Sequence, residues 1–427
     1  MKYVFRALVM GVWRILTHPV LLLMTGGYIV TLWAVNKMLM APTGDIFAAI
    51  SSLLHRLTFN TIFILIGLIL LWVLGTPKGF LRIMFGMARI QSLNNGAGEI
   101  PMLLSRTPTG HGRGEIWEFE AYGVPLSMFI DAQEKLESAL DIALVSADNG
   151  SDGRKIVLTV VPHPGPWPAL LPWDIQKIPR QNSVVVLGEN RGEQILHDFD
   201  VTPHLICASQ SGGGKSVLLK SIMLQLLHKE WTVYLIDYKR GADYGADWES
   251  RCALITDDTP LLALLDELYA EMERRYDTMH QASCPNIEVY NSKRGQSMTR
   301  VALCFDEVAE ALERSSGMSS DEKKLKEQIA YRLSSIARLG RAAGISLVLS
   351  TQRGSADVIP PQVRSNVQAI CGIANENLSM LTLGTADAHK RIPKTARGRF
   401  LTADGTMFQG YYSDFGPECF EGVPTHA

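Results

Sequence analysis

Two long runs of apolar residues dominate the amino-terminal part of the chain. No Asp, Glu, Lys or Arg occurs between Arg14 and Lys37, or between Arg56 and Lys78. Each run is about twenty residues long, which matches one helical crossing of a bilayer. Core helices rarely lack charge on every face, and a signal peptide has a shorter apolar run followed by an A-x-A site. The pattern predicts a membrane anchor over residues 1–89, with spans at about 15–36 and 57–77.

The basic residues around these runs indicate an orientation. The loop between the runs carries only Lys37 and Arg56, both at its edges, whereas three basic residues precede the first run and three follow the second: Lys2, Arg6, Arg14, Lys78, Arg82 and Arg89. Basic residues are retained on the cytoplasmic side. We therefore expect a multi-pass protein of the cell membrane, with both termini in the cytoplasm.

The next stretch predicts a linker followed by a small domain. Residues 90–113 are rich in Gly, Asn, Pro and Ser, which predicts little regular structure. Helical spacing over 117–146, a turn at 148–153 and an apolar strand at 155–161 then predict a small α+β domain over residues 114–175. The proline-rich residues 162–172 separate it from the rest of the chain.

Short apolar β runs alternate with helical patterns from about Ser183 onward, as in residues 184–187, 204–207, 232–236, 301–305 and 345–350. Near-continuous apolar strands separated by helices are typical of a parallel sheet covered on both faces. The helix before the last strand carries one apolar stripe: Leu325, Ile329, Leu333 and Ile336. Residues 176–427 are therefore expected to form an α/β nucleotide-binding domain.

A glycine-rich loop lies between a predicted strand and a predicted helix, at Ser209, Gln210, Ser211, Gly212, Gly213, Gly214, Lys215, Ser216 and Val217. It fits the Walker A pattern except that Ser209 replaces the first glycine. Its backbone N–H groups and the helix N-terminus are expected to bind phosphate oxygens. Lys215 would neutralise the β- and γ-phosphates of ATP, and Ser216 would ligate Mg²⁺. The alternative is an ordinary glycine-rich turn that caps a helix.

An acidic pair follows the predicted strand at 301–305. Asp306 is placed where a Walker B aspartate holds Mg²⁺, and Glu307 is expected to orient the attacking water or take its proton. Gln352, at the end of the next strand, is a candidate sensor of the γ-phosphate. The alternatives are a plain strand end for the pair and a surface polar residue for Gln352.

Two arginines lie near the end of the helix that carries the apolar stripe. Arg338 and Arg341 are candidates for an arginine finger that reaches the γ-phosphate of a neighbouring subunit. The alternative is a solvated helix end, where basic residues are favoured by the helix dipole.

Composition adds two constraints. The formal net charge is −2, so any DNA site must be a local patch or a ring made by assembly. The six cysteines include no C-x-x-C pair, and several lie in apolar runs. This usage favours reduced, buried thiols in a cytosolic domain rather than a zinc site.

Residues 187–412 resemble the motor domain of the FtsK/SpoIIIE-type DNA translocases. The matching stretches are Pro203–Leu205, Leu235–Lys239, Phe305–Glu307, Gly340–Ile345 and Ser350–Arg353. The resemblance implies a RecA-like fold, ATP and Mg²⁺ as cofactors, and a homo-oligomeric ring, expected to be a hexamer, with DNA in its pore. Tyr238 and Gly354 stand where the family usually has proline.

A short chain with two spans, one motor and no winged-helix module is most similar to the FtsK-like transfer ATPases of Gram-positive conjugative elements. This implies transfer of DNA to a conjugative channel, with a relaxase and channel proteins as partners. A chromosome-segregation pump and a type VII-like secretion ATPase remain alternatives, although secretion ATPases usually carry several motors in tandem. A nucleotide-binding scaffold without turnover is the non-enzyme alternative, against which Glu307 argues.

DNA contacts are expected to be sequence-independent and salt-dependent, because basic side chains on pore loops bind the phosphate backbone. The candidates are Lys293, Arg294, Arg300, Lys323, Lys324, Lys326 and Arg353.

Overall fold

The structure, a computed structural model, describes residues 2–39, 46–77, 79–90, 92–110, 112–294, 298–352 and 359–425. Backbone contacts divide the chain into two compact units. The first comprises Met1–Thr107, Ile116–Leu140 and Ala147–Leu158, and the second comprises Pro108–Glu115, Asp141–Ser146 and Thr159–Ala427.

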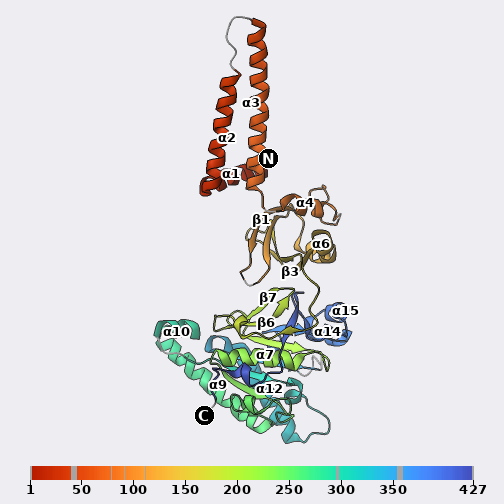
Figure 1. Cartoon of the computed structure of the whole chain (residues 1–427). Helices are drawn as coiled ribbons and strands as arrows, with labels where there is room; N and C mark the ends of the chain where they lie inside the picture. The colour runs from red at the N-terminus through yellow and green to blue at the C-terminus, as the bar shows by residue number, and fades with distance from the viewer. Residues whose placement is uncertain are drawn as a thin grey trace. The chain divides into compact units, whose positions relative to one another are not determined.

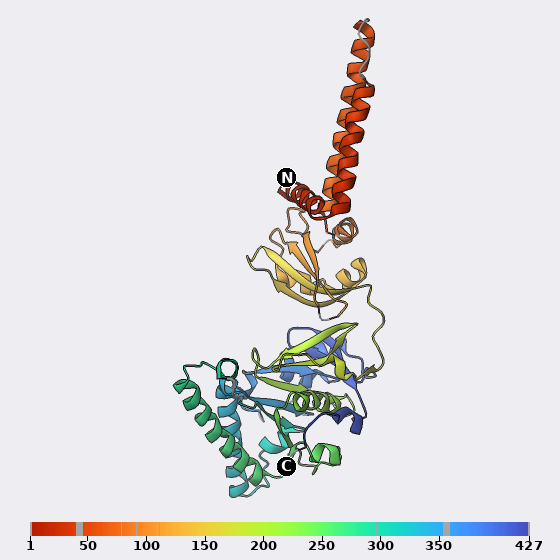
Figure 2. The same cartoon turned by 60° about the vertical axis from the view of Figure 1, so that its left-hand side comes forward.

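Three helices begin the first unit: α1 (Lys2–Thr17), α2 (Pro19–Met38) and α3 (Ile46–Gly75). Both α2 and α3 are long and apolar enough to cross a membrane, and no residue of either described helix is buried. They lie side by side as a hairpin (Figures 1 and 2). The first span begins at Pro19 instead of residue 15, because the proline occupies the first turn of α2 and separates it from α1. The second begins eleven residues earlier than expected.

Polar and aromatic side chains join the two long helices at two places. The amide groups of Asn36 and Asn60 exchange hydrogen bonds of 2.7 and 3.1 Å, and the Tyr28 ring stacks on Phe63 with centroids 3.9 Å apart. Each amide thus satisfies hydrogen-bonding groups of the other.

A four-stranded sheet of order β1-β2-β4-β3 follows the hairpin. Its elements are α4 (Phe80–Ala88), β1 (Met102–Pro108), β2 (Glu115–Glu120), α5 (Leu126–Asp131), α6 (Gln133–Leu140), β3 (Ile142–Asn149) and β4 (Lys155–Pro162). The expectation of little structure over 90–113 was wrong for residues 102–108, where Leu103 of β1 is fully buried.

The helix expected over residues 117–146 is divided between β2, α5, α6 and β3. Tyr122 and Gly123 both have positive φ and form a turn after β2. Asp141 also has positive φ, so α6 ends there and Ile142 begins β3. The expected strand at 155–161 is confirmed as β4.

A large mixed sheet forms the centre of the second unit. Its main path runs β10-β9-β11-β12-β8-β13-β14-β15-β6-β7, and β5 pairs with β15. The strands are β5 (Leu171–Pro172), β6 (Val184–Asn190), β7 (Glu193–Asp198), β8 (His204–Ala208), β9 (Thr232–Ile236), β10 (Ala253–Ile255), β11 (Val301–Phe305), β12 (Ile345–Thr351), β13 (Val367–Cys371), β14 (Arg399–Thr402) and β15 (Met407–Tyr412).

The expected parallel sheet is confirmed for six strands, from β10 to β13. The remainder of the main path, including β6, pairs antiparallel. The apolar run at 184–187 therefore does not belong to the parallel region, although the strand itself is confirmed. Burial on both faces makes an antiparallel strand as uniformly apolar as a parallel one.

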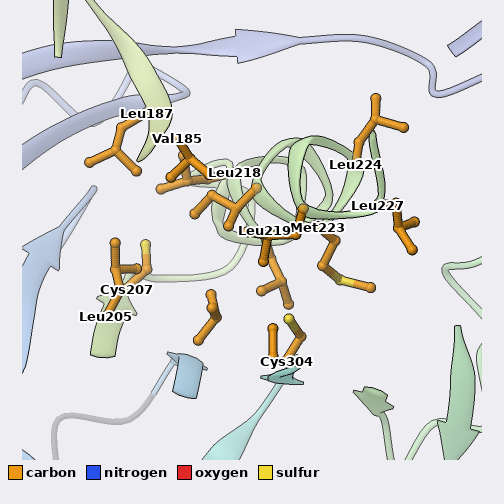
Figure 3. Close-up of a cluster of buried hydrophobic side chains, with 14 of the residues drawn as sticks. Val185, Leu187, Leu205, Cys207, Leu218, Leu219, Met223, Leu224, Leu227 and Cys304 are labelled. Carbon is orange, nitrogen blue, oxygen red and sulfur yellow. The ribbon is translucent and has the colours of Figure 1, made fainter. Parts of the chain in front are cut away.

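Helices cover both faces of this sheet (Figures 1 and 2). They are α7 (Lys215–His228), α8 (Ala246–Glu249), α9 (Asp258–Gln281), α10 (Ile287–Arg294), α11 (Val308–Leu312), α12 (Ser320–Ala343), α13 (Pro361–Arg364), α14 (Glu376–Leu383) and α15 (Asp387–Arg391), with 3₁₀ turns at Ile175–Lys177 and Pro417–Phe420. Along β11, Cys304 packs with α7 in one core, whereas Leu303 and Phe305 pack with α9 and α12 in the other. Figure 3 shows the α7 core.

His204 ties the central strand β8 to its neighbours. Its Nδ1 accepts a hydrogen bond from the Leu347 N–H at 3.0 Å, so Nε2 carries the proton and donates to the Ala337 carbonyl at 3.1 Å. The bond that Nδ1 accepts requires the neutral ring, because a protonated ring has no acceptor nitrogen. Burial lowers the pKa of His204 to about 4.

Candidate nucleotide-binding site

The glycine-rich loop lies between the end of β8 and the start of α7, at the carboxyl edge of the parallel strands. Gly212 and Gly214 have φ values of +75° and +98°. A Cβ on Gly213 would lie 2.0 Å from Ser209 Oγ, so this position also requires glycine. The loop therefore brings backbone N–H groups and the N-terminus of α7 to one concave site.

Ser209, the departure from the Walker A pattern, has a structural role. Its side chain is fully buried, and its Oγ donates to the Ile373 carbonyl at 3.2 Å. Its N–H donates to the Thr351 carbonyl at 3.1 Å. Gly372 leaves room for the hydroxyl, because a Cβ there would approach Ser209 Oγ to 2.8 Å. The serine fastens the loop between β12 and β13.

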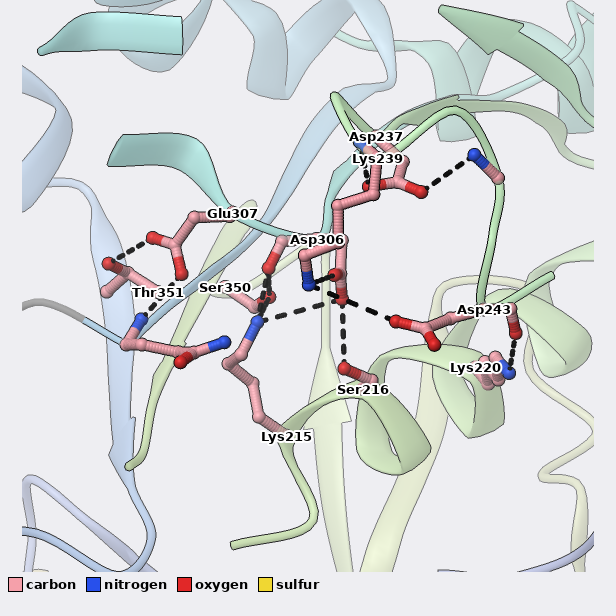
Figure 4. A network of polar contacts seen from close by, with 12 residues as sticks. Lys215, Ser216, Lys220, Asp237, Lys239, Asp243, Asp306, Glu307, Ser350 and Thr351 are labelled. Atoms are coloured by element: carbon pink, nitrogen blue, oxygen red, sulfur yellow. Dashed lines mark hydrogen bonds and ion pairs between the residues drawn. The ribbon is translucent and has the colours of Figure 1, made fainter. Parts of the chain in front are cut away.

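Asp306 meets the glycine-rich loop directly (Figure 4). Ser216 Oγ donates to Asp306 Oδ1 at 3.0 Å, and Lys215 Nζ lies 3.6 Å from the same oxygen. Lys215 also donates to Ser350 Oγ at 2.9 Å and to the Asp306 carbonyl. Side chains 90 positions apart in sequence thus form one buried group of charges.

The second oxygen of Asp306 is exceptional. Asp306 is only 1% exposed, yet its Oδ2 accepts no hydrogen bond from the described residues. A buried carboxylate oxygen is costly unless it has a partner. Together with the phosphate-sized concavity of the loop, this oxygen fits a site for a phosphate-bound divalent cation, for which carboxylate and hydroxyl oxygens are suitable ligands.

Glu307 is held at the end of β12 (Figure 4). Thr351 Oγ1 donates to its Oε1 at 2.7 Å, and the Gln352 N–H donates to its Oε2 at 2.8 Å. Gln352 has an exposed side chain and lines the pocket beside the loop. The carboxylate is therefore oriented by two donors next to the phosphate loop.

Asp237 and Lys239 form a part of the site to which the motif analysis gave no role. Asp237 is 3% exposed and accepts hydrogen bonds from the N–H groups of Lys239 and Gly241. Lys239 Nζ lies 3.7 Å from Asp306 Oδ2. Desolvation lowers the pKa of the Lys239 ammonium, but nearby carboxylates, chiefly that of Asp306, outweigh it and leave the pKa raised. The sequence did give one indication of these two residues, because the stretch Leu235–Lys239 is one of those that resemble the translocase family.

A segment near the carboxyl end touches the phosphate loop. The Gly398 N–H donates to the Gly213 carbonyl at 3.0 Å, and a Cβ on Gly214 would lie 2.9 Å from Gly398 Cα. Gln409 holds this segment by donating from Nε2 to the Arg397 carbonyl. Sequence reasoning missed these residues. No motif around Gly398 indicates that it contacts the glycine-rich loop, which lies far earlier in the chain.

The proline-rich residues expected to separate two domains pack beside the same pocket. Trp167 lies under the guanidinium groups of Arg399, at 3.9 Å, and Arg191, at 5.0 Å. Burial, and then the charge of Arg191, lowers the pKa of Arg399 to about 10. β5 pairs with β15, and Trp173 packs edge-on against Tyr411. The segment is thus a wall of the site.

These segments enclose a pocket of about 590 Å³. The glycine-rich loop, Lys239 and Gln352 line part of it. The rest of the lining includes Ala169 and Leu170 with residues of β14, β15 and the preceding loop: Arg397, Gly398, Phe400, Gln409, Gly410, Tyr411 and Tyr412. Charged groups together with apolar and aromatic ones suit a nucleotide.

Neither candidate arginine finger is among the described residues that line this pocket. Arg338 and Arg341 are both exposed, and Arg341 Nε donates to the Asp200 carbonyl at 2.8 Å. A role in a neighbouring subunit's site stays a prediction.

Two of the basic residues expected to contact DNA are buried in ion pairs within the protein. Arg300 is 8% exposed and donates twice to the Asp200 carboxylate, and Lys326 is 5% exposed and pairs with Asp258 at 2.9 Å. The expectation that either contacts DNA was wrong, since burial in ion pairs leaves no cation at the surface. Lys293 and Lys324 are exposed, and Lys323 contacts the Ser316 carbonyl. Arg353 and the Arg294 side chain lie outside the described residues.

The chain is similar to several known proteins over the region that contains this site. Residues 172–356 match the model of the FtsK/SpoIIIE family. The DNA translocase FtsK of Campylobacter jejuni subsp. jejuni (strain 81-176) is 27% identical over 259 residues, which are 57% of this chain and 26% of that protein. FtsK of Treponema pallidum (strain Nichols) is 33% identical over 196 residues, 43% of this chain and 23% of that protein. The chain thus spans about a quarter of the length of these relatives.

A solved structure covers more of the chain. The pCW3 conjugation coupling protein TcpA, in its monomer form with ATPγS, is 29% identical with a TM-score of 0.56. The match covers 79% of this chain and 96% of the solved TcpA chain.

The mixed sheet and the loop after β8 define a P-loop nucleotide-binding fold of the RecA-like class. More particularly, residues 172–356 match the FtsK/SpoIIIE family model, and relatives similar to this chain are named as DNA translocases.

Proposed function

We propose that this protein is a membrane-anchored, ATP-driven DNA translocase that delivers DNA to a conjugative transfer channel. The observation that carries the ATPase part is the 3.0 Å hydrogen bond between Ser216 and Asp306, which joins the phosphate loop to the acidic strand end. The fold supports a nucleoside triphosphate as substrate, because few other ligands need both a phosphate loop and a carboxylate beside it.

In this proposal ATP lies along the pocket, with its phosphates on Gly212, Gly213 and Gly214. Lys215 neutralises the β- and γ-phosphates. Ser216 and Asp306 would hold a magnesium ion, which supplies charge neutralisation of the phosphate oxygens. The base lies toward Leu170 and Tyr412, where the pocket wall is largely apolar.

Hydrolysis is assigned to the end of β12 and its surroundings. Glu307, oriented by Thr351 and the Gln352 backbone, positions the attacking water and accepts its proton. The Gln352 side chain senses the γ-phosphate. Arg341, or Arg338 nearby, completes the site of the adjacent subunit in a ring, which we expect to be a hexamer.

DNA as the transported substrate is supported by the FtsK/SpoIIIE domain and by the names of the translocase relatives. Conjugative transfer is favoured over chromosome segregation because the match to the solved chain of TcpA, a conjugation coupling protein, covers 96% of that chain. The apolar helices α2 and α3 support a membrane anchor. The basic residues flanking them support cytoplasmic termini.

ATPase assays on the full-length protein test the proposal. DNA is expected to stimulate hydrolysis in a salt-dependent way, since binding releases counterions from the phosphate backbone. Lys215→Ala serves as the inactive control. Turnover indifferent to DNA would support a protein-secretion motor instead, and absence of turnover would support a nucleotide-binding scaffold.

A mating assay separates transfer from segregation. Glu307→Gln is expected to abolish DNA transfer from donor cells while their growth and nucleoid partitioning stay normal. Normal mating together with defective partitioning would instead identify a chromosome pump.

A further inference from the structure

Lys239 contacts the one oxygen of Asp306 that has no hydrogen bond. Its Nζ lies 3.7 Å from Asp306 Oδ2 and 3.9 Å from Asp243 Oδ2. The side chain is 46% exposed and lines the pocket, so it can move without leaving the site. Figure 4 marks both ion pairs of the Lys239 ammonium with dashed lines.

The backbone holds Lys239 in this position. The buried Asp237 carboxylate accepts from the Lys239 N–H at 3.0 Å and the Gly241 N–H at 2.9 Å, and the Asp237 N–H donates to the Ile255 carbonyl at 3.0 Å. Arg240 has φ +60°, which closes the turn. The turn after β9 is therefore fixed, and only the side chain of Lys239 is free to move.

Asp306 is consequently flanked by two ammonium groups that differ in burial. Lys215, on the Oδ1 side, is 5% exposed and bonded to Ser350, whereas Lys239, on the Oδ2 side, is half exposed. A buried carboxylate needs a countercharge when no metal is bound. A divalent cation at the same carboxylate would repel the nearby ammonium.

We propose, on the basis of the function proposed above, that Lys239 is a resident counter-ion of Asp306 that excludes free divalent cations and yields only to a metal–nucleotide complex. When nucleotide is present, its phosphate oxygens offer the displaced ammonium a new partner. Without nucleotide, displacement from Asp306 leaves Lys239 with Asp243 as its remaining ion-pair partner among the described residues. Metal binding and nucleotide binding are thereby coupled.

Mn²⁺ binding to the nucleotide-free, full-length protein tests this role by electron paramagnetic resonance, without any turnover. Lys239→Met is expected to bind Mn²⁺ about tenfold more tightly than the wild type, because a repelling charge has been removed. Lys239→Arg, which keeps the charge, is expected to resemble the wild type. Asp306→Asn is expected to remove binding in either background.

Lys229→Met provides the matched control. It removes the same charge from the end of α7, about 20 Å along the helix from the phosphate loop at about 1.5 Å per residue. Lys229 donates to the Pro179 and Gln181 carbonyls and not to Asp306. Its Mn²⁺ affinity is expected to equal that of the wild type. Adding ATPγS is expected to bring the Mn²⁺ affinities of the wild type and Lys239→Met together.

Equal or weaker Mn²⁺ binding by nucleotide-free Lys239→Met would overturn the inference. This failure is distinguishable from failure of the proposed function, which is judged by hydrolysis in the wild type and its loss in Lys215→Ala. A wild type that hydrolyses ATP normally while Lys239→Met shows no gain in Mn²⁺ affinity refutes only the role of Lys239.

Discussion

The helical hairpin and the phosphate-loop region both reverse the usual distribution of side chains in a soluble protein, in opposite ways. In the hairpin, apolar side chains are exposed, as for Leu23 at 76% and Ile69 at 59%. Around the phosphate loop, charged side chains are buried, as for Lys215 at 5% and Asp306 at 1%. Each reversal is unfavourable in water alone.

The difference shows what each region requires from its surroundings. Exposed hydrocarbon over the length of α2 and α3 is stable when the solvent is lipid. Buried ammonium and carboxylate groups are stable when they compensate each other, and the Asp306 oxygen that accepts no hydrogen bond from the described residues leaves a position for a further ligand. Changes to charge should therefore act on hydrolysis in one region and on membrane insertion in the other.

Removal of the loop lysine has the largest expected effect. Lys215→Ala should lower the rate of ATP hydrolysis by about 10²- to 10³-fold, because a preorganised cation at the phosphates is lost. Membrane association should be unchanged, since the hairpin is intact. Steady-state ATPase assays and membrane flotation measure the two effects. Hydrolysis at the parental rate would contradict the site assignment.

A charge placed in the hairpin should impair membrane insertion and leave ATP binding intact. Leu68→Arg, near the middle of the second apolar run, should cost about 3 kcal/mol of membrane insertion free energy. Alkaline extraction is expected to release more of this variant than of the control Leu68→Phe. ATP binding by the solubilised protein should be retained. Full membrane retention of the arginine variant would argue against α3 as a span.

Acid should destabilise the second unit but not the hairpin. Burial lowers the pKa of His197 and of His204 to about 4, below the ordinary 6.5. Only the unfolded chain then takes up protons as the pH falls below 6.5. The contribution of each neutral histidine to the free energy of unfolding is therefore fully present above pH 6.5. It declines as the pH falls further and levels off near pH 4. At pH 5 the loss is about 2 kcal/mol per histidine.

Denaturant unfolding at pH 7.5 and 5.0 measures this loss. His204→Phe should be less stable overall but should show a smaller pH dependence than the wild type. An unchanged pH dependence in that variant would exclude His204 as a contributor.

The smallest effect is expected at the polar pair in the hairpin. Asn60→Leu breaks the exchange of hydrogen bonds with Asn36 and should destabilise the hairpin by about 0.6 kcal/mol, a typical value for such bonds in membranes. Unfolding of the detergent-solubilised protein in SDS, followed by tryptophan fluorescence, measures it. Leu57→Val is a control on the same helix. A loss as large as that of a buried core residue would mean that the pair organises the whole hairpin.

Local patterns predicted the parts of this molecule that depend on local chemistry. The apolar runs gave the two long helices, and the order of strand, glycine-rich loop and helix located Lys215 and Ser216. The stripe at Ile329, Leu333 and Ile336 gave α12, whose start is fixed by a capping box at Ser319 and Glu322.

The parts that sequence reasoning missed depend on contacts between distant segments. Gly398 supports the phosphate loop through a backbone hydrogen bond, which no side-chain pattern encodes. Trp167 lies in a proline-rich stretch that is indistinguishable from a linker until Arg191 and Arg399 are seen to hold it. The helix expected over 117–146 was misassigned in part because apolar spacing in β3 also fits a helix, and the positive φ of Asp141 separates α6 from β3.

The most direct test of the account is an experimental structure of the full-length protein with ATPγS and magnesium. We predict that the terminal phosphates lie against Gly212–Ser216, with the metal bridging them to Asp306. Phosphate density bound elsewhere on the protein, or a metal beyond the reach of Ser216 and Asp306, would contradict the central claim.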